Sequence, residues 1–412
     1  MIHILFIDDI ACSSQNGIGT FRDELLKSLT AFGRMRVSLI SMNSEVSSIE
    51  TYENKGLHQI KLPRFGNGKW RQCGGDIASV LRSEVVDSKE NIFVLNYSPC
   101  SEFIAELKLV FPLSRWVFVI HDQGWCAPLL GDVHLLTDII NGKNPDIVSA
   151  KTMEYVRDYC SKELAIYNEV DKVVCLSQST YNVLLQVYKV PPFKPAIISN
   201  GINSGIGKKL RISKEQARIK LGLKEKDTII VSVGRPVRHK GINVLMLAMQ
   251  LMIRKHSEIK FVLAGNSNAI KQHLSVFPDI EPNIILPGYL DAEELSLLYS
   301  AADVGVISSY TEQCSYAALE MMNAGLPIVT SDGFGLCDMF ADGENAFVAH
   351  IGNVTEVKEY AKRLSFAIER ALIASDTIVD QYSQFNQKML SDRYSAFSMA
   401  LAYEDMFNSL IY

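Results

Sequence analysis

The fold is decided by a stretch in the middle of the chain, where residues 228–241 read TIIVSVGRPVRHKG. Of its first six residues, four are apolar and five are β-branched, which is typical of a buried strand. Gly234 lets the backbone turn sharply after this strand, and a helical pattern begins near Ile242. A strand, a glycine turn and a helix in this order predict one unit of a parallel sheet in an α/β domain.

The same alternation extends over most of the chain in both directions. The apolar runs are continuous rather than alternating, which indicates strands that are covered on both faces by helices. We therefore predict an α/β protein with two doubly wound, Rossmann-like domains. The strand-like runs are Ile4–Ile7, Val37–Ile40, Ile92–Leu95, Val117–Ile120 and Val173–Leu176 in the first half, and Thr228–Val233, Lys260–Ala264, Asn283–Leu286, Asp303–Ile307 and Pro327–Thr330 in the second.

A proline-rich stretch marks the boundary between the two domains. Three prolines fall within residues 191–195, and a new strand is expected at Ala196–Ile198. We predict a first domain over residues 1–195, a second over 196–385, and a terminal helix within 386–412 that could cross back to the first domain. Two such domains facing each other would leave a cleft at the carboxyl ends of their strands, where open α/β sheets bind ligands.

Composition excludes several classes of protein. The 412 residues carry 41 Lys+Arg against 46 Asp+Glu, so the chain lacks the cationic excess of a general nucleic-acid binder. No apolar run reaches the roughly 18 residues needed to span a bilayer, and the N-terminus reads as a strand rather than a signal peptide. The eight cysteines form no C-x-x-C pair and are expected to be reduced, mostly buried thiols. We expect a cytoplasmic protein, with peripheral contact at the inner face of the membrane left open.

The turn after residues 228–233 carries the first candidate site. Arg235 and Lys240 would lie at the rim of the cleft, where both could reach one diphosphate. A guanidinium together with an ammonium suits a leaving group that gains negative charge. A solvated basic turn is an equal alternative, because Arg238, His239 and Lys240 are consecutive.

The second candidate is an acidic motif in residues 310–320, which read YTEQCSYAALE. Glu312 is expected in a loop and Glu320 on the helix that follows, whose N-terminus is a ready anion site. A phosphate there would put a ribose near Glu320 and a sugar near Glu312. Two unrelated surface acids are the alternative, weakened because Glu320 lies in an apolar stretch where a charge needs a partner. The N–H groups of the anion site belong to Ser315, Tyr316 and Ala317.

The first domain offers weaker signals. Gly17 and Gly19 form only a G-x-G after the first strand, so they are either a loop that brings backbone close to a ligand or an ordinary turn. His121 follows an apolar strand and could contact a substrate hydroxyl, act as a base or cap its own loop. Residues 64–71 combine cations, aromatics and glycines, and we interpret them as a mobile, solvated loop.

Several motifs are absent from the sequence. There is no strand-end Asp-x-Asp and no His/Cys/carboxylate cluster with metal spacing, so we predict no metal site and expect cationic side chains rather than Mg²⁺ to neutralise phosphates. The lack of a G-x-S-x-G or Walker loop argues against the corresponding hydrolases and NTPases.

Together these residues resemble the retaining GT-B glycosyltransferases of glycosyltransferase family 4. Gly234-Arg235 with Lys240-Gly241 resembles the family's G-R-x4-K-G loop, and Glu312 with Glu320 matches its E-x7-E motif. Further resemblances, in the family's order, are Ser177, residues 199–202, residues 324–329 and residues 342–346, where Ala346 replaces a glycine. The run Gln313-Cys314 departs from the family pattern and would alter the sugar pocket.

The resemblance implies transfer of a sugar, with retained anomeric configuration, from a nucleoside diphosphate sugar to an acceptor hydroxyl in glycan or glycoconjugate biosynthesis. Arg235 and Lys240 would hold the diphosphate, Glu320 the ribose and Glu312 the donor sugar. Gly17 and Gly19 would let the backbone approach the phosphate, and His121 would contact the sugar.

The same resemblance implies no cofactor and no metal, with a UDP-sugar as the expected donor. The acceptor could be a saccharide, a lipid-linked saccharide, a small molecule or a peptide. The alternatives are a nucleotide-sugar epimerase or hydrolase on the same fold and a non-catalytic nucleotide-sugar-binding subunit. A nicotinamide oxidoreductase ranks last because the glycine motif is incomplete.

Overall fold

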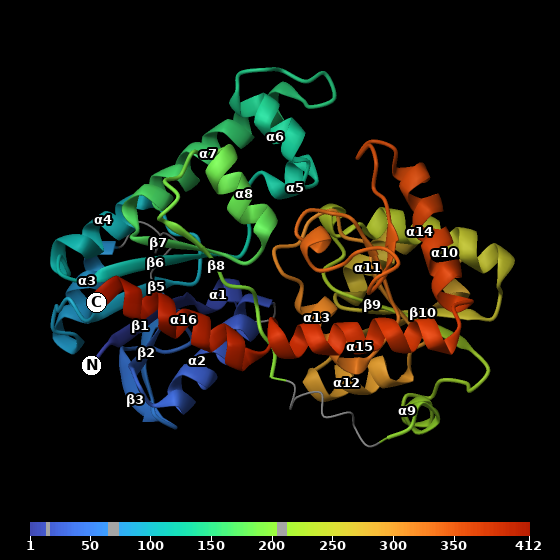
Figure 1. The fold of residues 1–412 in the computed structure, drawn as a ribbon, viewed down its shortest axis with the longest axis horizontal. Coiled ribbons are helices and arrows are strands. Elements are labelled where there is room, and N and C mark those ends of the chain that lie inside the picture. The colour runs from blue at the N-terminus through green and yellow to red at the C-terminus, as the bar shows by residue number, and fades with distance from the viewer. Residues whose placement is uncertain (14–16, 65–73, 204–211) are drawn as a thin grey trace. The chain divides into compact units, whose positions relative to one another are not determined.

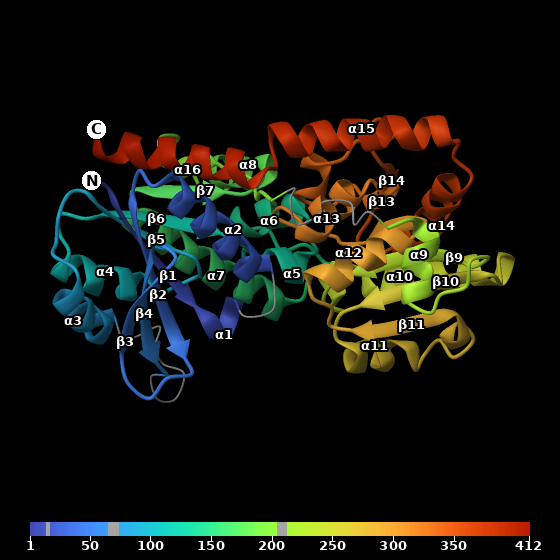
Figure 2. The ribbon, with the colours of Figure 1, turned by 90° about the horizontal axis from the view of Figure 1, so that it is seen from below.

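The computed structural model describes the chain except for residues 14–16, 65–73 and 204–211. It divides into two units, each built around its own sheet with helices on both faces (Figures 1 and 2). The first unit comprises Met1–Trp125, Val133–Gly201 and Ala396–Tyr412, and the second comprises Cys126–Asp132 and Ile202–Ser395. The predicted fold class, two doubly wound α/β domains, is confirmed.

The first unit has, in its described part, an eight-stranded sheet in the order β3-β4-β2-β1-β5-β6-β7-β8. All neighbours pair in parallel except β3 and β4, which form an antiparallel hairpin at one edge. The central strands are buried, apart from Arg115 at the start of β6, as their continuous apolar sequences predict. The strands are β1 (His3–Asp9), β2 (Arg36–Ser44), β3 (Glu50–Asn54), β4 (Leu57–Pro63), β5 (Asn91–Leu95), β6 (Arg115–Ile120), β7 (Lys172–Cys175) and β8 (Pro195–Ile197).

Helices connect these strands and cover the sheet. The terminal helix α16 packs beside α2, and α3, α4 and α7 pack against one another. The helices are α1 (Ile10–Ser13), α2 (Gly17–Phe32), α3 (Gly74–Glu84), α4 (Ser101–Val110), α6 (Val133–Ile140), α7 (Ala150–Glu169), α8 (Gln178–Gln186) and α16 (Ala396–Ile411).

The second unit has a six-stranded sheet among its described residues, in the order β11-β10-β9-β12-β13-β14. Every neighbouring pair is parallel, so the carboxyl ends of the strands lie along one edge. Helices α10 and α14 pack together over the sheet and bury one continuous apolar core. The strands are β9 (Thr228–Val233), β10 (Ile259–Ala264), β11 (Ile284–Gly288), β12 (Val304–Ile307), β13 (Ile328–Ser331) and β14 (Phe347–Ala349).

Local sequence explains where the helices of this unit begin. Ser213 with Gln216 and Asp291 with Glu294 form reciprocal capping boxes at the starts of α9 and α12. The elements are α5 (Cys126–Leu129), α9 (Lys214–Lys220), α10 (Ile242–Lys255), α11 (Ser267–Leu274), α12 (Ala292–Ala301), α13 (Tyr316–Ala324), α14 (Val357–Leu372), α15 (Asp376–Asp392) and the 3-10 turns η2 (Arg238–Lys240), η3 (Glu281–Asn283) and η4 (Leu336–Asp338).

The structure corrects three details of the predicted organisation. The strand expected at Ala196–Ile198 to open the second domain is β8 of the first sheet, because Ala196 pairs with Val174 of β7. The expected terminal helix is α16, which belongs to the first unit, whereas residues 386–392 of the predicted range belong to α15 of the second unit. The segment Cys126–Asp132 packs in the second unit, where Leu130 joins the apolar core.

Two further properties concern the described residues only. None of their helices is both long enough and apolar enough to cross a membrane. Of the cysteines described there, Cys126, Cys160, Cys175 and Cys314 are buried.

Candidate functional site

The turn after β9 is shaped by two glycines. Gly234 has a φ of +152° directly after the strand, and Gly241 has a φ of +74° at the start of α10. A Cβ on residue 241 would lie 1.9 Å from the carbonyl oxygen of Ser308, which follows β12. The Ser308 hydroxyl in turn donates to the carbonyl of Lys240 at 3.1 Å. Only glycine permits this close approach, so the basic turn is fixed against the end of the neighbouring strand.

The two sequence motifs meet in an ion pair. Lys240 Nζ lies 2.7 Å from Glu312 Oε2, and it also donates to the Thr311 carbonyl at 3.3 Å. The hydroxyl of Ser309 donates to the other carboxylate oxygen of Glu312 at 2.8 Å. The side chains of Lys240 and Glu312 keep 23% and 16% of their surface exposed, so solvent reaches the pair. The basic turn and the acidic loop therefore form one site at the carboxyl ends of β9 and β12.

Arg235 adds a second cation to this site. Its side chain is exposed, and no ion pair of Arg235 occurs among the residues that the structure describes. Burial, together with the charges of Lys240 and Arg235, lowers the pKa of His239 to about 4. His239 is therefore neutral at pH 7, and the positive charge of the turn at this site comes from its arginines and Lys240.

The N-terminus of α13 lies immediately after the acidic loop. Ser315 is the N-cap, and its hydroxyl accepts from the N–H of Ala318 at 3.3 Å. Ser315 and Tyr316 are buried, and Ala317 is half-buried. The first-turn N–H groups of a helix point along its axis toward the preceding loop, here the loop of Glu312, and favour an anion.

Glu320 lies one turn further along α13. Its carboxylate accepts a hydrogen bond from the hydroxyl of Tyr299, on α12, at 2.9 Å. Burial raises the pKa of Glu320 to about 7. Glu320 is therefore not an ordinary surface acid, and Tyr299 is a site residue that the sequence motifs did not identify.

The departure from the family pattern, Gln313-Cys314, is also buried. The side-chain amide of Gln313 lies 3.8 Å from the Cys126 sulfur, in the short segment that joins the second unit. Gly131 of that segment has a φ of +73°, and a Cβ there would lie 2.9 Å from both the Tyr310 carbonyl oxygen and the Phe334 side chain. This segment therefore packs directly on the loop that carries Glu312.

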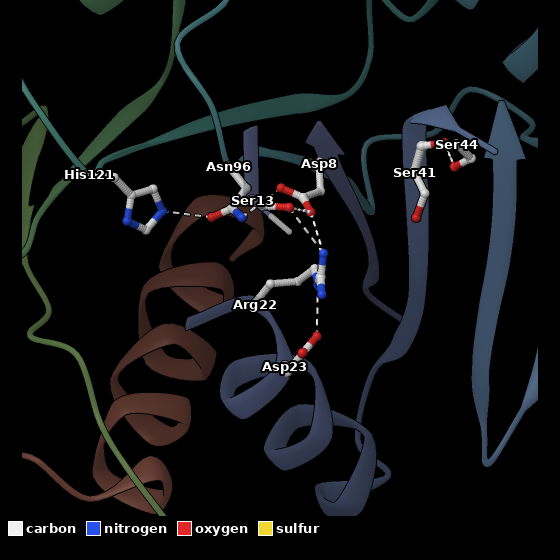
Figure 3. A network of polar contacts seen from close by, with 8 residues as sticks. All are labelled: Asp8, Ser13, Arg22, Asp23, Ser41, Ser44, Asn96 and His121. Carbon is white, nitrogen blue, oxygen red and sulfur yellow. Dashed lines mark hydrogen bonds and ion pairs between the residues drawn. The ribbon is translucent and has the colours of Figure 1, made fainter. Parts of the chain in front are cut away.

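The remaining predicted residues belong to the first unit. His121 follows β6, and its Nε2 lies 2.7 Å from Asn96 Oδ1 in the polar network of Figure 3. Gly17 and Gly19 lie in the first turn of α2 rather than in a loop. A Cβ on residue 19 would lie 2.4 Å from the Ser13 carbonyl oxygen, so close packing within this unit is sufficient to require this glycine.

Two sequence predictions concern regions that give no further site. Of residues 64–71, the described Arg64 forms an exposed ion pair with Glu45, and the others lie outside the described residues. Across the described chain, no group of three or more His, Cys, Asp and Glu side chains is placed to hold a metal ion.

The second unit matches a known family. Residues 213–369 match the family model described as "Glycosyl transferases group 1", and this range contains the basic turn, the acidic loop and Glu320. The match lies entirely within the second unit. The second unit therefore contains a region that is similar to group 1 glycosyl transferases.

Individual relatives extend this similarity. An uncharacterized glycosyltransferase, MJ1607 of Methanocaldococcus jannaschii, is 29% identical over 199 residues, which cover 47% of this chain and 48% of the relative. Over this alignment the chain spans about half the length of that relative. The capsular polysaccharide biosynthesis glycosyltransferase CapM of Staphylococcus aureus is 20% identical over 92% of this chain and 90% of its own length.

Solved structures show the fold of the whole chain. Sucrose-phosphate synthase from Thermosynechococcus elongatus matches with a TM-score of 0.76 at 18% identity, covering 100% of this chain and 99% of the other. Anabaena Alr3699/HepE, solved in complex with UDP-glucose, matches with a TM-score of 0.69 at 14% identity, covering 99% and 100%. These matches identify the α/β fold as that of the GT-B glycosyltransferases.

Proposed function

We propose that the chain is a group 1 glycosyltransferase that moves a sugar from a nucleoside diphosphate sugar to an acceptor hydroxyl. The observation that carries this proposal is the pairing of Lys240 with Glu312 beside the N-terminus of α13. A cation, a carboxylate and a helix N-terminus at one sheet edge suit a ligand with both phosphate and sugar hydroxyls. The match of residues 213–369 to group 1 glycosyl transferases supports the same assignment.

Each residue has a distinct part in the proposed reaction. Arg235 and Lys240 bind the diphosphate and stabilise the negative charge that develops on it as the glycosidic bond breaks. First-turn N–H groups of α13 bind the same phosphates, namely those of Ser315, Tyr316 and Ala317. Glu312 accepts hydrogen bonds from donor-sugar hydroxyls while it orients the Lys240 ammonium, and Glu320 accepts from the ribose. The proposal also includes His121 as a contact of the donor sugar, and Gly17 and Gly19 as positions where backbone can approach a phosphate.

Retention of configuration belongs to the proposal as well. The leaving phosphate takes the proton of the acceptor hydroxyl on the same face of the sugar from which it departs. The motif order typical of the retaining family 4 supports this assignment. Arg235 and Lys240 supply the positive charge in this scheme, and no metal is invoked.

The relatives support a donor and a biological role for the proposal. Alr3699/HepE has been solved with UDP-glucose, which supports a UDP-sugar as donor. CapM is named as a capsular polysaccharide biosynthesis glycosyltransferase, and a further relative is named alpha-monoglucosyldiacylglycerol synthase. We place this chain in cytoplasmic glycan or glycoconjugate biosynthesis, with a saccharide, lipid-linked, small-molecule or peptide acceptor.

A donor screen tests the proposal. The purified chain is melted with UDP-, GDP- and ADP-sugars, because a ligand that binds the folded state raises the Tm by mass action. The donor that raises the Tm is then incubated with an acceptor panel and with no acceptor. Acceptor-dependent release of nucleoside diphosphate supports the transferase. Conversion of the donor without acceptor would instead indicate an epimerase or hydrolase, and the absence of any Tm shift would contradict nucleotide-sugar binding.

A further inference from the structure

A second polar network lies at the carboxyl edge of the first sheet. Asp8 is near the end of β1, Asn96 follows β5, and His121 follows β6. These strands are consecutive in the sheet order β1-β5-β6, so their ends are neighbours. The backbone N–H of Asn96 donates to the carbonyl of Ile7 at 3.0 Å, which fixes Asn96 between the other two side chains. Figure 3 shows these side chains in a row, with Arg22 of α2 beyond Asp8.

The directions of the hydrogen bonds follow from Asp8. Its Oδ2 accepts from Arg22 Nη1 at 2.6 Å and from the Ser13 hydroxyl at 2.7 Å. Its Oδ1 lies 2.9 Å from the side-chain nitrogen of Asn96. A carboxylate paired with a guanidinium accepts hydrogen bonds and donates none, so Asn96 must present its NH₂ group to Asp8.

The orientation of Asn96 then determines the proton on His121. With its NH₂ group on Asp8, Asn96 presents its carbonyl oxygen to His121 Nε2 at 2.7 Å. A carbonyl oxygen only accepts, so the hydrogen must be on Nε2. Burial lowers the pKa of His121 to about 3, so the ring carries this single proton at pH 7. Its Nδ1 then presents a lone pair.

Packing holds the ring in this orientation. The Phe21 ring meets His121 edge to face with centroids 4.8 Å apart. Figure 3 shows Nδ1 on the side of the ring that faces away from Asn96, and no hydrogen bond to Nδ1 occurs within the described residues. Residue His121 as a whole is only partly buried. Nδ1 is therefore a fixed acceptor for a group outside the network.

We propose that Asp8, acting through Asn96, holds His121 as the Nε2–H tautomer, so that Nδ1 accepts a hydrogen bond from a hydroxyl of the donor sugar. Asp8 and Asn96 are positioning residues in this scheme, and His121 is the residue that touches the ligand. The identity of the ligand rests on the proposed function, whereas the tautomer rests on the network alone. In the Nδ1–H tautomer, Nδ1 could not accept a hydrogen bond from a hydroxyl. The network of Asp8 and Asn96 therefore selects which ligand group can bind at Nδ1 of His121.

The tautomer can be read from nitrogen NMR of the full chain labelled with ¹⁵N-histidine. His121→Gln assigns the His121 resonances. We expect a protonated-type shift at Nε2 and an unprotonated-type shift at Nδ1 throughout pH 6–8. An Nδ1–H form, or a mixture of tautomers in the wild type, would overturn the proposal without the need for any further variant.

Two Asp→Asn variants test the relay, which runs from Asp8 through Asn96 to His121. They replace the two aspartates that pair with Arg22. Asp8→Asn lets Asn96 flip, because an amide offers both a donor and an acceptor, and we expect His121 to become a mixture of tautomers. Asp23→Asn is the matched control, since exposed Asp23 accepts only from the Arg22 Nε side at 2.7 Å and lies outside the relay. If Asp8→Asn is unfolded under the conditions of the measurement, Asn96→Leu also breaks the hydrogen-bond connection between Asp8 and His121. An unchanged tautomer in either relay variant would contradict the role of Asp8.

The ligand half of the proposal uses UDP-glucose and UDP as probes. UDP-glucose should shift the Nδ1 resonance and UDP should not, since only UDP-glucose carries the hydroxyls of a donor sugar, whereas UDP carries those of its ribose alone. Asp8→Asn should weaken UDP-glucose binding in proportion to the fraction of His121 that leaves the Nε2–H form, about twofold for an equal mixture of tautomers, and leave UDP binding unchanged. UDP-glucose binding with no Nδ1 shift would overturn the contact to the sugar. If neither probe binds, the UDP-glucose donor of the proposed function fails, while the wild-type spectrum still decides the tautomer.

Discussion

The carboxyl edges of the two sheets carry opposite kinds of polar chemistry on the same α/β architecture. In the first unit, the charge of Arg22 is matched by Asp8 and Asp23, and the relay through Asn96 ends in a neutral imidazole. In the second unit, Lys240 pairs with Glu312 at a solvent-accessible position, and exposed Arg235 adds further positive charge. The comparison teaches that the fold sets the location of the site, while the charge balance decides whether an edge suits hydroxyls or phosphates.

The largest effect is expected at the charged edge. Lys240→Ala and Glu312→Ala should each lower turnover at least about a hundredfold while the protein stays folded, because each removes electrostatic stabilisation of the transition state. Turnover is measured with the donor found by the screen, and folding by circular dichroism.

The chain supplies a matched control at the other end of α10. Lys255 pairs with Glu369 at 2.7 Å, the same distance as in the Lys240–Glu312 pair. Lys255→Ala should leave turnover unchanged. Unchanged turnover in both site variants, or an equal loss in Lys255→Ala, would remove the functional distinction between the two pairs.

An intermediate effect is expected from Glu320, whose pKa is raised to about 7 by burial. The carboxylate form accepts ribose hydroxyls, and its fraction rises as pH increases through 7. Affinity for the donor should therefore weaken as pH falls from 8 to 6, by up to roughly tenfold per unit below the pKa. Titration calorimetry of the donor at several pH values measures this dependence.

Glu320→Gln should bind the donor weakly and equally at all of these pH values. Glu163→Gln is the matched control, because burial raises the pKa of Glu163 to about 7 as well, but Glu163 lies in the first unit. This variant should keep the pH dependence of donor affinity that the wild type shows. A pH dependence that survives in Glu320→Gln would assign the titration to another group.

The smallest effect is expected at Glu163, which differs from Glu320 in its role. It accepts from the N–H of Gly124 at 2.7 Å and from the Tyr188 hydroxyl, and so holds the loop after β6. Burial raises its pKa from 4.5 to about 7 in the folded state, so folding favours the neutral carboxyl, and the stability that this preference contributes is complete below pH 4.5 and is lost as pH rises through about 7. The Tm should fall by a few degrees between pH 5 and pH 8.

Glu163→Gln should flatten this pH dependence, because an amide carries no titrating charge, its oxygen can still accept from the N–H of Gly124, and its NH₂ group can donate to the Tyr188 oxygen. Glu169→Gln, at the exposed end of the same helix α7, should behave as the wild type. A Tm that falls equally in Glu163→Gln and in the wild type would show that this carboxyl is not the titrating group.

Continuous apolar runs predicted most of the fold, because strands buried on both faces need no polar alternation. The edge hairpin of β3 and β4 was missed, since residues 50–54 read ETYEN and are largely exposed. A short strand such as β8 carries no signal for the sheet it joins, and only its pairing with β7 assigns it to the first unit.

The charged part of the site was predictable because both motifs lie at strand ends, and Lys240 and Glu312 meet as their positions indicated. The partners were harder to find. Tyr299 reaches Glu320 from another helix, and Asn96 and Asp8 reach His121 from other strands. The strand-end position that pointed to His121 applies equally to Asp8 and Asn96, and could have identified both.

The central claim is that the basic turn binds a diphosphate. Titration calorimetry with UDP, GDP and ADP, on the wild type and on Arg235→Ala, tests it most directly. Arg235 is exposed and its replacement leaves the Lys240–Glu312 pair in place, so folding should be unaffected. We expect one of the three nucleotides to bind the wild type and to bind Arg235→Ala at least tenfold more weakly, as the loss of a charge-assisted contact predicts. Equal affinity in the two proteins, or no binding of any nucleotide to the wild type, would contradict it.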